Sequence, residues 1–125
     1  GLPRSLPALL RAYTIGKRAA GGGFDWTTAT GVVDKIEEEV RELRETLTED
    51  PSNARRAEEE MGDLLFAIAN LSRKLGIEPE AALRKANEKF TARFTAMEQR
   101  IADSGRQMGT MTLPALEAEW QRGKP

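Results

Sequence analysis

Apolar residues recur every three or four positions along most of the chain, and this spacing predicts amphipathic α-helices. Glycines and prolines interrupt the pattern, and no stretch alternates in the way that predicts a strand. We expect helices at residues 5–20, from Thr27 or Thr28 to about Leu47, from Ser52 to about Leu75, at 79–103 and at 113–121. The sequence therefore predicts an all-α fold, an antiparallel bundle of four main helices and a short C-terminal helix. A chain of 125 residues suits one domain, spanning residues 1–125.

Apolar stripes run along the second, third and fourth predicted helices. A stripe that covers one side of a helix is the side expected to face the core. We predict a core built from Val33, Ile36, Val40, Leu43 and Leu47 on the second helix, from Met61, Leu64, Leu65, Ile68, Leu71 and Leu75 on the third, and from Leu83, Ala86, Phe90, Phe94, Met97 and Ile101 on the fourth.

Two pairs of acidic residues stand beside these stripes. Glu39 and Glu42 are three positions apart on the second predicted helix, and Glu60 and Asp63 have the same spacing on the third. Residues three apart share one face of a helix, and the short break at 49–52 lets the two helices fold back antiparallel. Facing carboxylates repel one another unless a divalent cation with oxygen ligands lies among them. The spacing therefore predicts a magnesium site in an enzyme that acts on phosphates.

A solvated helix surface is the alternative explanation for these acids, because runs such as residues 37–39 and 58–60 are common on surfaces. The metal site is favoured because both pairs adjoin an apolar stripe on consecutive helices. The chain has no Cys and no His, which excludes disulfides, thiolate chemistry and a Ser-His-Asp triad. The net charge of −1 gives no reason to expect binding to a nucleic-acid polymer or to an anionic membrane.

Cations near the acids fit a triphosphate substrate. Lys89 and Arg93 form a basic stripe one turn apart on the fourth predicted helix, although such a stripe alone is more often surface. A tryptophan such as Trp120 is more often a packing residue than a ligand contact. The sequence leaves two interpretations of Asn70, as a group that faces the site or as a surface amide. Gly21-Gly22-Gly23 is read as a plain turn, since no P-loop Lys-Ser/Thr follows it.

Four sequence elements together resemble the MazG nucleoside triphosphate pyrophosphohydrolases. They are Gly23-Phe24-Asp25-Trp26, Lys35-x-x-Glu38-Glu39-x-x-Glu42, residues 58–67 (EEEMGDLLFA) and residues 85–94 (KANEKFTARF). The match covers roughly Leu6 to Lys124 and looks like the catalytic C-terminal domain of a two-domain member, or a single-domain relative. The start at Gly1 without Met also suggests a piece of a longer protein. Gly21-Gly22 departs from the bulkier residues expected there, and this departure concerns the entry loop rather than the metal site.

The resemblance implies an all-α homodimer that hydrolyses nucleoside triphosphates to monophosphate and pyrophosphate with Mg²⁺, for which Mn²⁺ can substitute. It implies a cytoplasmic enzyme that cleans the nucleotide pool. Carried over by motif position, the metal ligands are Glu39, Glu42, Glu60 and Asp63. The nucleotide site is lined by Lys35, Arg56, Glu59, Lys89, Arg93, Trp120 and Lys124. We expect Glu38, beside the ligands, to take the proton of the attacking water as the catalytic base.

Two other functions stay open. The first is that of a relative with the same fold that hydrolyses one narrow substrate, such as dUTP, dCTP or phosphoribosyl-ATP. The second is that of a non-catalytic helical dimerisation module, which predicts no Mg²⁺-dependent turnover. A panel of triphosphates separates these functions.

Overall fold

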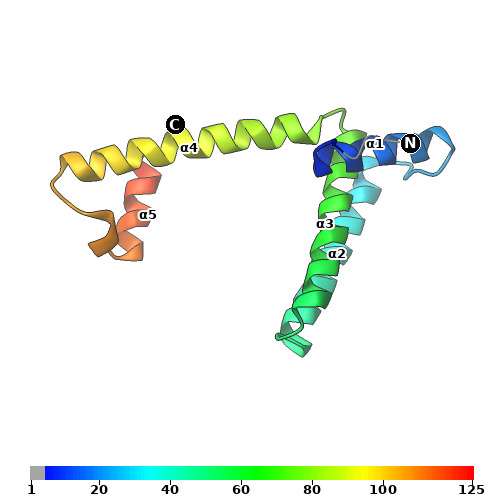
Figure 1. Ribbon diagram of the computed structural model, residues 1–125, viewed down its shortest axis with the longest axis horizontal. Helices are drawn as coiled ribbons and strands as arrows, with labels where there is room; N and C mark the ends of the chain where they lie inside the picture. Colours follow the sequence, from blue (N-terminus) through cyan, green and yellow to red (C-terminus); the bar gives the residue numbers. More distant parts are fainter. Residues whose placement is uncertain (1–4) are drawn as a thin grey trace. The chain divides into compact units, whose positions relative to one another are not determined.

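The computed structural model describes residues 5–125, and these contain helices and turns but no strand. The helices are α1 (Ala8–Gly21), α2 (Ala29–Glu49), α3 (Ala54–Lys74), α4 (Pro79–Asp103) and α5 (Leu113–Arg122), with a short 3₁₀ helix at Met108–Thr110 (Figure 1). The all-α prediction is confirmed. None of the helices in the described chain is long and apolar enough to cross a membrane.

The helices gather into two compact units. The first unit ends at Ala82 and the second begins at Leu83, so α4 starts in the first unit and continues into the second. The prediction of a single domain over residues 1–125 stays a prediction.

Side-chain caps fix where the helices begin. The hydroxyl of Thr28 accepts a hydrogen bond from the backbone N–H of Gly31 at 3.0 Å, which caps α2 as predicted. At α3 the capping residue is Asn53, whose Oδ1 accepts from the N–H of Arg56 at 3.0 Å. The prediction of Ser52 as this cap is wrong by one position, because either polar residue satisfies the local pattern.

The first unit is built on α3. Figure 1 shows α2 and α3 as a long antiparallel pair, as the short break at residues 49–52 predicted, with α1 packed against α3. The closest approach of α1 is at Gly16, which is buried against Asn70 and Arg73. A Cβ at position 16 would overlap Oδ1 of Asn70, so only glycine permits this contact.

The predicted core stripes of α2 and α3 are only partly buried. Val40 is 42% exposed, Leu65 46% and Leu47 57%. The prediction that these stripes form the core is wrong for the half-exposed members, because neighbouring smaller and polar residues take the most buried positions on the two helices. The buried residues of α2 and α3 are Val32, Glu39, Thr46, Ala67, Ala69 and Asn70. The side chains left exposed, which we call the apolar face, are Val33, Val40, Leu47, Met61, Leu65, Ile68 and Leu75.

In the second unit, α5 packs against α4. Met97 and Ile101 of α4 are buried, as predicted. Leu83 and Phe90 are about half exposed, so the predicted core face is wrong for these two residues. The ring of Trp120 on α5 lies 5.2 Å from that of Phe90, measured between centroids. This contact joins a ten-residue helix, too short to be stable alone, to a long one.

Candidate active site

Three of the predicted metal ligands come together in the first unit. Glu39 and Glu42 project from α2 and Glu60 from α3, and one carboxylate oxygen of each lies within 4.8 Å of the others. The i, i+3 spacing on α2 and the antiparallel pairing of α2 with α3 produce this acid cluster. Asp63 lies one turn after Glu60 on α3, is exposed, and does not belong to the group.

The acid cluster contains polar atoms that the described chain leaves without partners. Glu39 is 5% exposed, and its Oε2 is buried with no hydrogen bond within residues 5–125. The same holds for Oε2 of Glu60. A buried carboxylate oxygen without a partner is costly, and a hard divalent cation is the ligand that carboxylates of this arrangement take. The residues therefore fit a divalent metal ion.

The charges in the cluster repel. The carboxyl of Glu60, with which Glu42 can share a proton, raises the pKa of Glu42 above its usual value. Burial and the negative charges of Glu60 and Glu38 act in the same direction, while Lys35 opposes them. A cation among the carboxylates reverses this balance, since it favours the ionised form.

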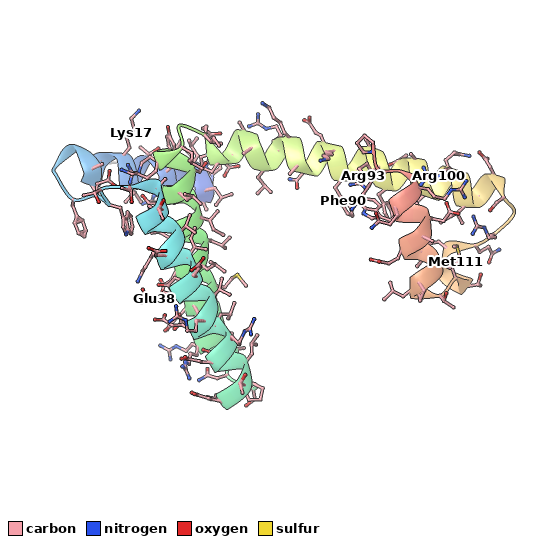
Figure 2. All side chains as sticks on the ribbon, turned by 180° about the vertical axis from the view of Figure 1, so that it is seen from behind. Lys17, Glu38, Phe90, Arg93, Arg100 and Met111 are labelled. Carbon is pink, nitrogen blue, oxygen red and sulfur yellow. The ribbon has the colours of Figure 1, made fainter. Side chains whose placement is uncertain are left out.

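Lys35 is the cation closest to the cluster. Its Nζ lies 3.1 Å from Oε1 of Glu39 and 3.5 Å from Oε1 of Glu38, and these contacts, that with Glu39 foremost, raise the pKa of Lys35. Glu38 itself is exposed beside the cluster (Figure 2). It can therefore reach solvent, as a base that takes a proton from water must.

Two further candidates lie on the first turns of α3. Arg56 is half-buried, whereas Glu59 is exposed and pairs loosely with Arg55, Nε to Oε1, at 3.9 Å. Exposed pairs at this distance contribute little to stability, so Glu59 is free to take another partner.

The remaining candidates lie in the second unit. Lys89 is exposed on α4, and Lys124 is exposed just after α5. Arg93 lies over the ring of Trp120, with its guanidinium carbon 4.0 Å from the ring centroid. Figure 2 labels Phe90 and Arg93 on α4 where α5 approaches it. The structure thus brings Arg93 and Trp120 together as a cation–π pair.

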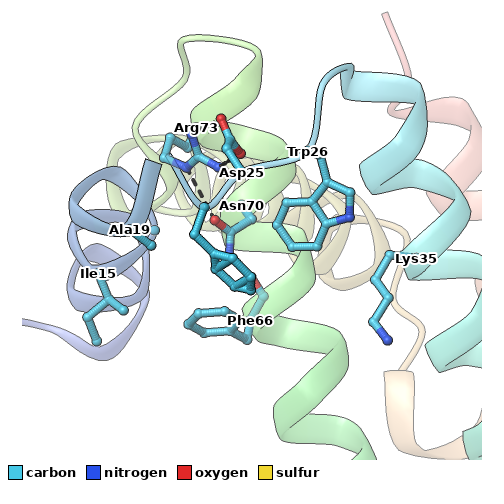
Figure 3. Close-up of a pocket in the computed structure, with 10 residues that line it drawn as sticks. Ile15, Ala19, Asp25, Trp26, Lys35, Phe66, Asn70 and Arg73 are labelled. Carbon is cyan, nitrogen blue, oxygen red and sulfur yellow. Dashed lines mark hydrogen bonds and ion pairs between the residues drawn. The ribbon is translucent and has the colours of Figure 1, made fainter. Parts of the chain in front are cut away.

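A pocket of about 430 Å³ lies in the first unit, and Lys35 lines it as well as pairing with Glu39 (Figure 3). Its walls are largely apolar and aromatic. Phe24 is 80% exposed, and Trp26 is half-buried. The lining residues are Ile15, Gly16, Ala19, Phe24, Asp25, Trp26, Lys35, Phe66, Asn70 and Arg73.

The loop that carries the aromatic residues of this pocket is tied to α3. The carboxylate of Asp25 accepts from NH2 of Arg73 at 2.6 Å and from Nζ of Lys74 at 3.2 Å. These bonds, that of Arg73 foremost, lower the pKa of Asp25 to about 2. Nζ of Lys74 also donates to the carbonyl of Trp26 at 2.8 Å. The loop is therefore held in place over the pocket.

Sequence reasoning did not find the partners of this loop. Asp25 and Arg73 lie 48 positions apart, and no local pattern links them. Asn70, left open by its sequence, is 2% exposed, donates to the carbonyl of Phe66 and accepts from Nε of Arg73, so it is not a surface amide. The signal that could have found the pocket is the pair of aromatics in Phe24-Asp25-Trp26, which follows a glycine turn in a chain with few aromatics.

Comparison with known proteins gives the family. Residues 27–97 match the model of the MazG nucleotide pyrophosphohydrolase domain. The chain belongs to the MazG family. It is 50% identical over 123 residues to the nucleoside triphosphate pyrophosphohydrolase of Escherichia coli (strain K12), covering 98% of this chain and 47% of that protein. It is 46% identical over 119 residues to the nucleoside triphosphate pyrophosphohydrolase/pyrophosphatase MazG of Thermotoga maritima, covering 95% of this chain and 45% of that protein. The chain thus spans about half the length of these relatives.

Some of the candidate residues lie inside the segment that matches the MazG model, and others lie outside it. Residues 27–97 include the acid cluster, Lys35 and the basic stripe of Lys89 and Arg93. The pocket residues Phe24 and Trp26 precede the matched segment, and Trp120 follows it. The alignments with the two MazG relatives extend over nearly the whole chain and so beyond that segment.

Proposed function

We propose that this MazG domain hydrolyses nucleoside triphosphates to monophosphate and pyrophosphate with the help of Mg²⁺. The observation that carries the proposal is the acid cluster of Glu39, Glu42 and Glu60, with two buried oxygens that lack partners, next to an aromatic pocket. Lys35 belongs to both features. The names of the E. coli and T. maritima relatives support the same reaction.

The proposed reaction breaks the bond between the α- and β-phosphates. The oxygen of a water forms a bond to the α-phosphorus, the bridging oxygen leaves with pyrophosphate, and Glu38 takes the proton of the water. Glu39, Glu42 and Glu60, with Asp63 as the fourth ligand by family resemblance, hold the metal. When bound, Mg²⁺ neutralises phosphate charge and makes the phosphorus more electrophilic.

The pocket offers a place for the nucleoside. Aromatic side chains stack on any base, because every base has a π-face. The polar groups of Asp25, Asn70 and Arg73 are engaged with one another, so they are not free to discriminate between bases by hydrogen bonds. This favours a broad substrate range over the narrow alternatives of dUTP, dCTP or phosphoribosyl-ATP.

The candidate cations are assigned to the phosphates. Lys89 and Arg93 are proposed to bind the two phosphates that leave as pyrophosphate, so that they stabilise this charge both in the bound substrate and on the leaving group. Nε and NH2 of Arg93 are buried and have no hydrogen-bond acceptor within the described chain, which leaves both donors for a ligand. The proposal also includes Arg56, Glu59, Trp120 and Lys124 in nucleotide binding, on the family resemblance.

A homodimer is part of the proposal. The apolar face of α2 and α3 carries large side chains at seven-residue intervals, Val33, Val40 and Leu47. A second copy presents the same face and covers it in a two-fold arrangement. Contiguous exposed apolar surface of this kind marks an interaction site.

The decisive experiment measures which product leaves. Purified protein is incubated with Mg²⁺ and each of the common ribo- and deoxyribonucleoside triphosphates, and pyrophosphate and orthophosphate are assayed separately. We expect pyrophosphate release from all of them. Orthophosphate release would overturn the proposal, because a different bond would be broken. The absence of Mg²⁺-dependent turnover would also overturn it and would leave the dimerisation module.

Variants of the acid cluster test the metal site. Glu60→Gln keeps the shape of the side chain but removes a ligand charge, and we expect a loss of at least about 100-fold in turnover, equal to about 2.7 kcal/mol. Without metal the variant should melt at a higher temperature, because repulsion is relieved, and added Mg²⁺ should stabilise it less than the wild type. Glu45→Gln, an exposed acid on α2, is the matched control and should behave as the wild type.

A further inference from the structure

Glu119 is a buried acid in the second unit, surrounded by arginines. The residue is 5% exposed, although it lies on a short helix near the end of the chain. Oε1 lies 2.8 Å from NH2 of Arg106 and 3.1 Å from NH1 of Arg122, and Oε2 lies 3.6 Å from Nε of Arg100. These cations lower the pKa of Glu119, with the hydrogen bond from Arg106 as the largest cause.

The three arginines belong to different segments. Arg100 is on α4, Arg106 follows α4, and Arg122 is on α5 itself. NH2 of Arg100 also donates to the backbone carbonyl of Glu119 at 2.8 Å. One carboxylate thus joins α5 to α4 and to the turn after α4, and it fixes both the rotation and the axial position of α5.

The residue that follows Glu119 is Trp120. Its ring lies 5.2 Å from that of Phe90, and the guanidinium of Arg93 lies 4.0 Å above it. Adjacent residues of a helix point about 100° apart, so the helix rotation that buries Glu119 also sets where Trp120 points. A shift of α5 would remove the surface on which Arg93 rests.

The position of Arg93 matters because its donors are unused. Nε and NH2 of Arg93 are buried without an acceptor in the described part of the chain. A planar guanidinium stacked on an indole keeps its N–H edge in one orientation, and such an edge grips phosphate oxygens bidentately. Losing that orientation costs affinity even when the charge remains.

We infer that Glu119 is a positioning residue for nucleotide binding: its carboxylate fixes α5 so that Trp120 supports Arg93 in the orientation that takes phosphate. The inference rests on the proposed function, which assigns Arg93 to the triphosphate. Neither the cluster of carboxylates nor the pocket enters it, because Glu119 acts only through Trp120 and Arg93.

The test compares Glu119→Gln with Glu117→Gln. Glutamine keeps the shape of Glu119 but leaves three arginines without a counter-charge, whereas Glu117 is exposed on the same helix. For the Mg²⁺-dependent hydrolysis of a nucleoside triphosphate, we expect Glu119→Gln to raise KM about tenfold and to change kcat less than threefold, since a misplaced phosphate contact weakens binding. Glu117→Gln should keep wild-type values.

A second arm separates positioning from a general loss of structure. In an Arg93→Ala background, Glu119→Gln should change kcat/KM less than twofold, because the group that it positions is gone. The same tenfold loss in that background would overturn the inference, as would an unchanged KM in the single variant. If Glu119→Gln does not fold, Arg106→Gln removes the shortest of the three ion pairs and should raise KM in the same direction by a smaller factor.

A third arm does not depend on turnover. In a Trp26→Phe background Trp120 is the only tryptophan, and Glu119→Gln should shift its emission to longer wavelength as the ring becomes more exposed. An unshifted emission would contradict the role of Glu119 in holding Trp120. If the wild type lacks triphosphate turnover, the proposed function fails and the phosphate role with it, while the emission still decides whether Glu119 holds Trp120.

Discussion

Replacing Gly16 by alanine should destabilise the protein, whereas the same replacement at Gly62 should stabilise it. Both glycines lie inside helices, so alanine gains about 1 kcal/mol of helix propensity at either position. The two sites differ in their surroundings. A Cβ at position 62 meets no atom of the described chain within 4 Å. A Cβ at position 16 would overlap Oδ1 of Asn70 and lie 3.0 Å from Nε of Arg73.

The magnitude follows from what must move. Asn70 is 2% exposed and cannot swing into solvent. Adding a methyl group to a close-packed contact costs about 1–3 kcal/mol, and losing the hydrogen bond from Arg73 to Asn70 costs about 0.5–1.5 kcal/mol. After the gain in propensity, we expect Gly16→Ala to lose about 1–3 kcal/mol. In a domain of this size that lowers Tm by about 4–12 °C, whereas Gly62→Ala should raise it by about 4 °C.

Thermal unfolding followed by circular dichroism measures both variants, and urea unfolding gives the free energies. A neutral or stabilising Gly16→Ala would refute the close approach of α1 to α3. A destabilising Gly62→Ala would show that another surface packs against this position, contrary to the open space around it. The opposite signs make the pair informative, because a general effect of alanine on helices moves both variants the same way.

Further predictions concern charge and assembly. Because Arg73 and Lys74 hold the pKa of Asp25 at about 2 instead of 3.8, its stabilising effect is complete above about pH 4 and is lost as pH falls towards 2. The Tm difference between wild type and Asp25→Asn should therefore shrink over that window, and a constant difference would contradict the pairing. Arg93→Lys should lower kcat/KM about tenfold although charge is kept, because lysine cannot bind bidentately, and unchanged kinetics would exclude such binding. Light scattering should show that the 13.8 kDa chain forms a dimer, and that Leu65→Glu converts this dimer to a monomer. A monomeric wild type would refute the dimer.

The sequence was sufficient to predict the helices and most of the acid cluster. A helix repeats its contacts every three to four residues, so the spacing of Glu39 and Glu42 determines that they share a side whatever packs against it. The short break before α3 then brings Glu60 towards them. The same reasoning fails for Asp63. Its spacing predicts that it lies beside Glu60 in the cluster, whereas in the structure it is exposed and outside the cluster.

Contacts between distant segments could not be predicted in this way. Asp25 and Arg73 meet because α1 crosses α3 at Gly16, and nothing near either residue in the sequence encodes that crossing. Glu117 and Glu119 look alike as acids two positions apart on a helix. Only the docking of α5 decides that one is exposed and the other buried among arginines.

At the apolar face the structure differs from what periodicity predicts, because residues expected in the core are exposed. Val40 and Leu65 belong to regular stripes that resemble core positions, yet both are close to half exposed. Exposed apolar area costs free energy in proportion to its extent, so a stripe of this regularity is expected to be covered. The pairing of α2 with α3 does not cover it in the described chain, where Val32, Thr46 and Ala67 are buried instead. The surface that completes the core must therefore come from outside the α2–α3 pair, and the same face of a second copy is the complementary surface that we propose.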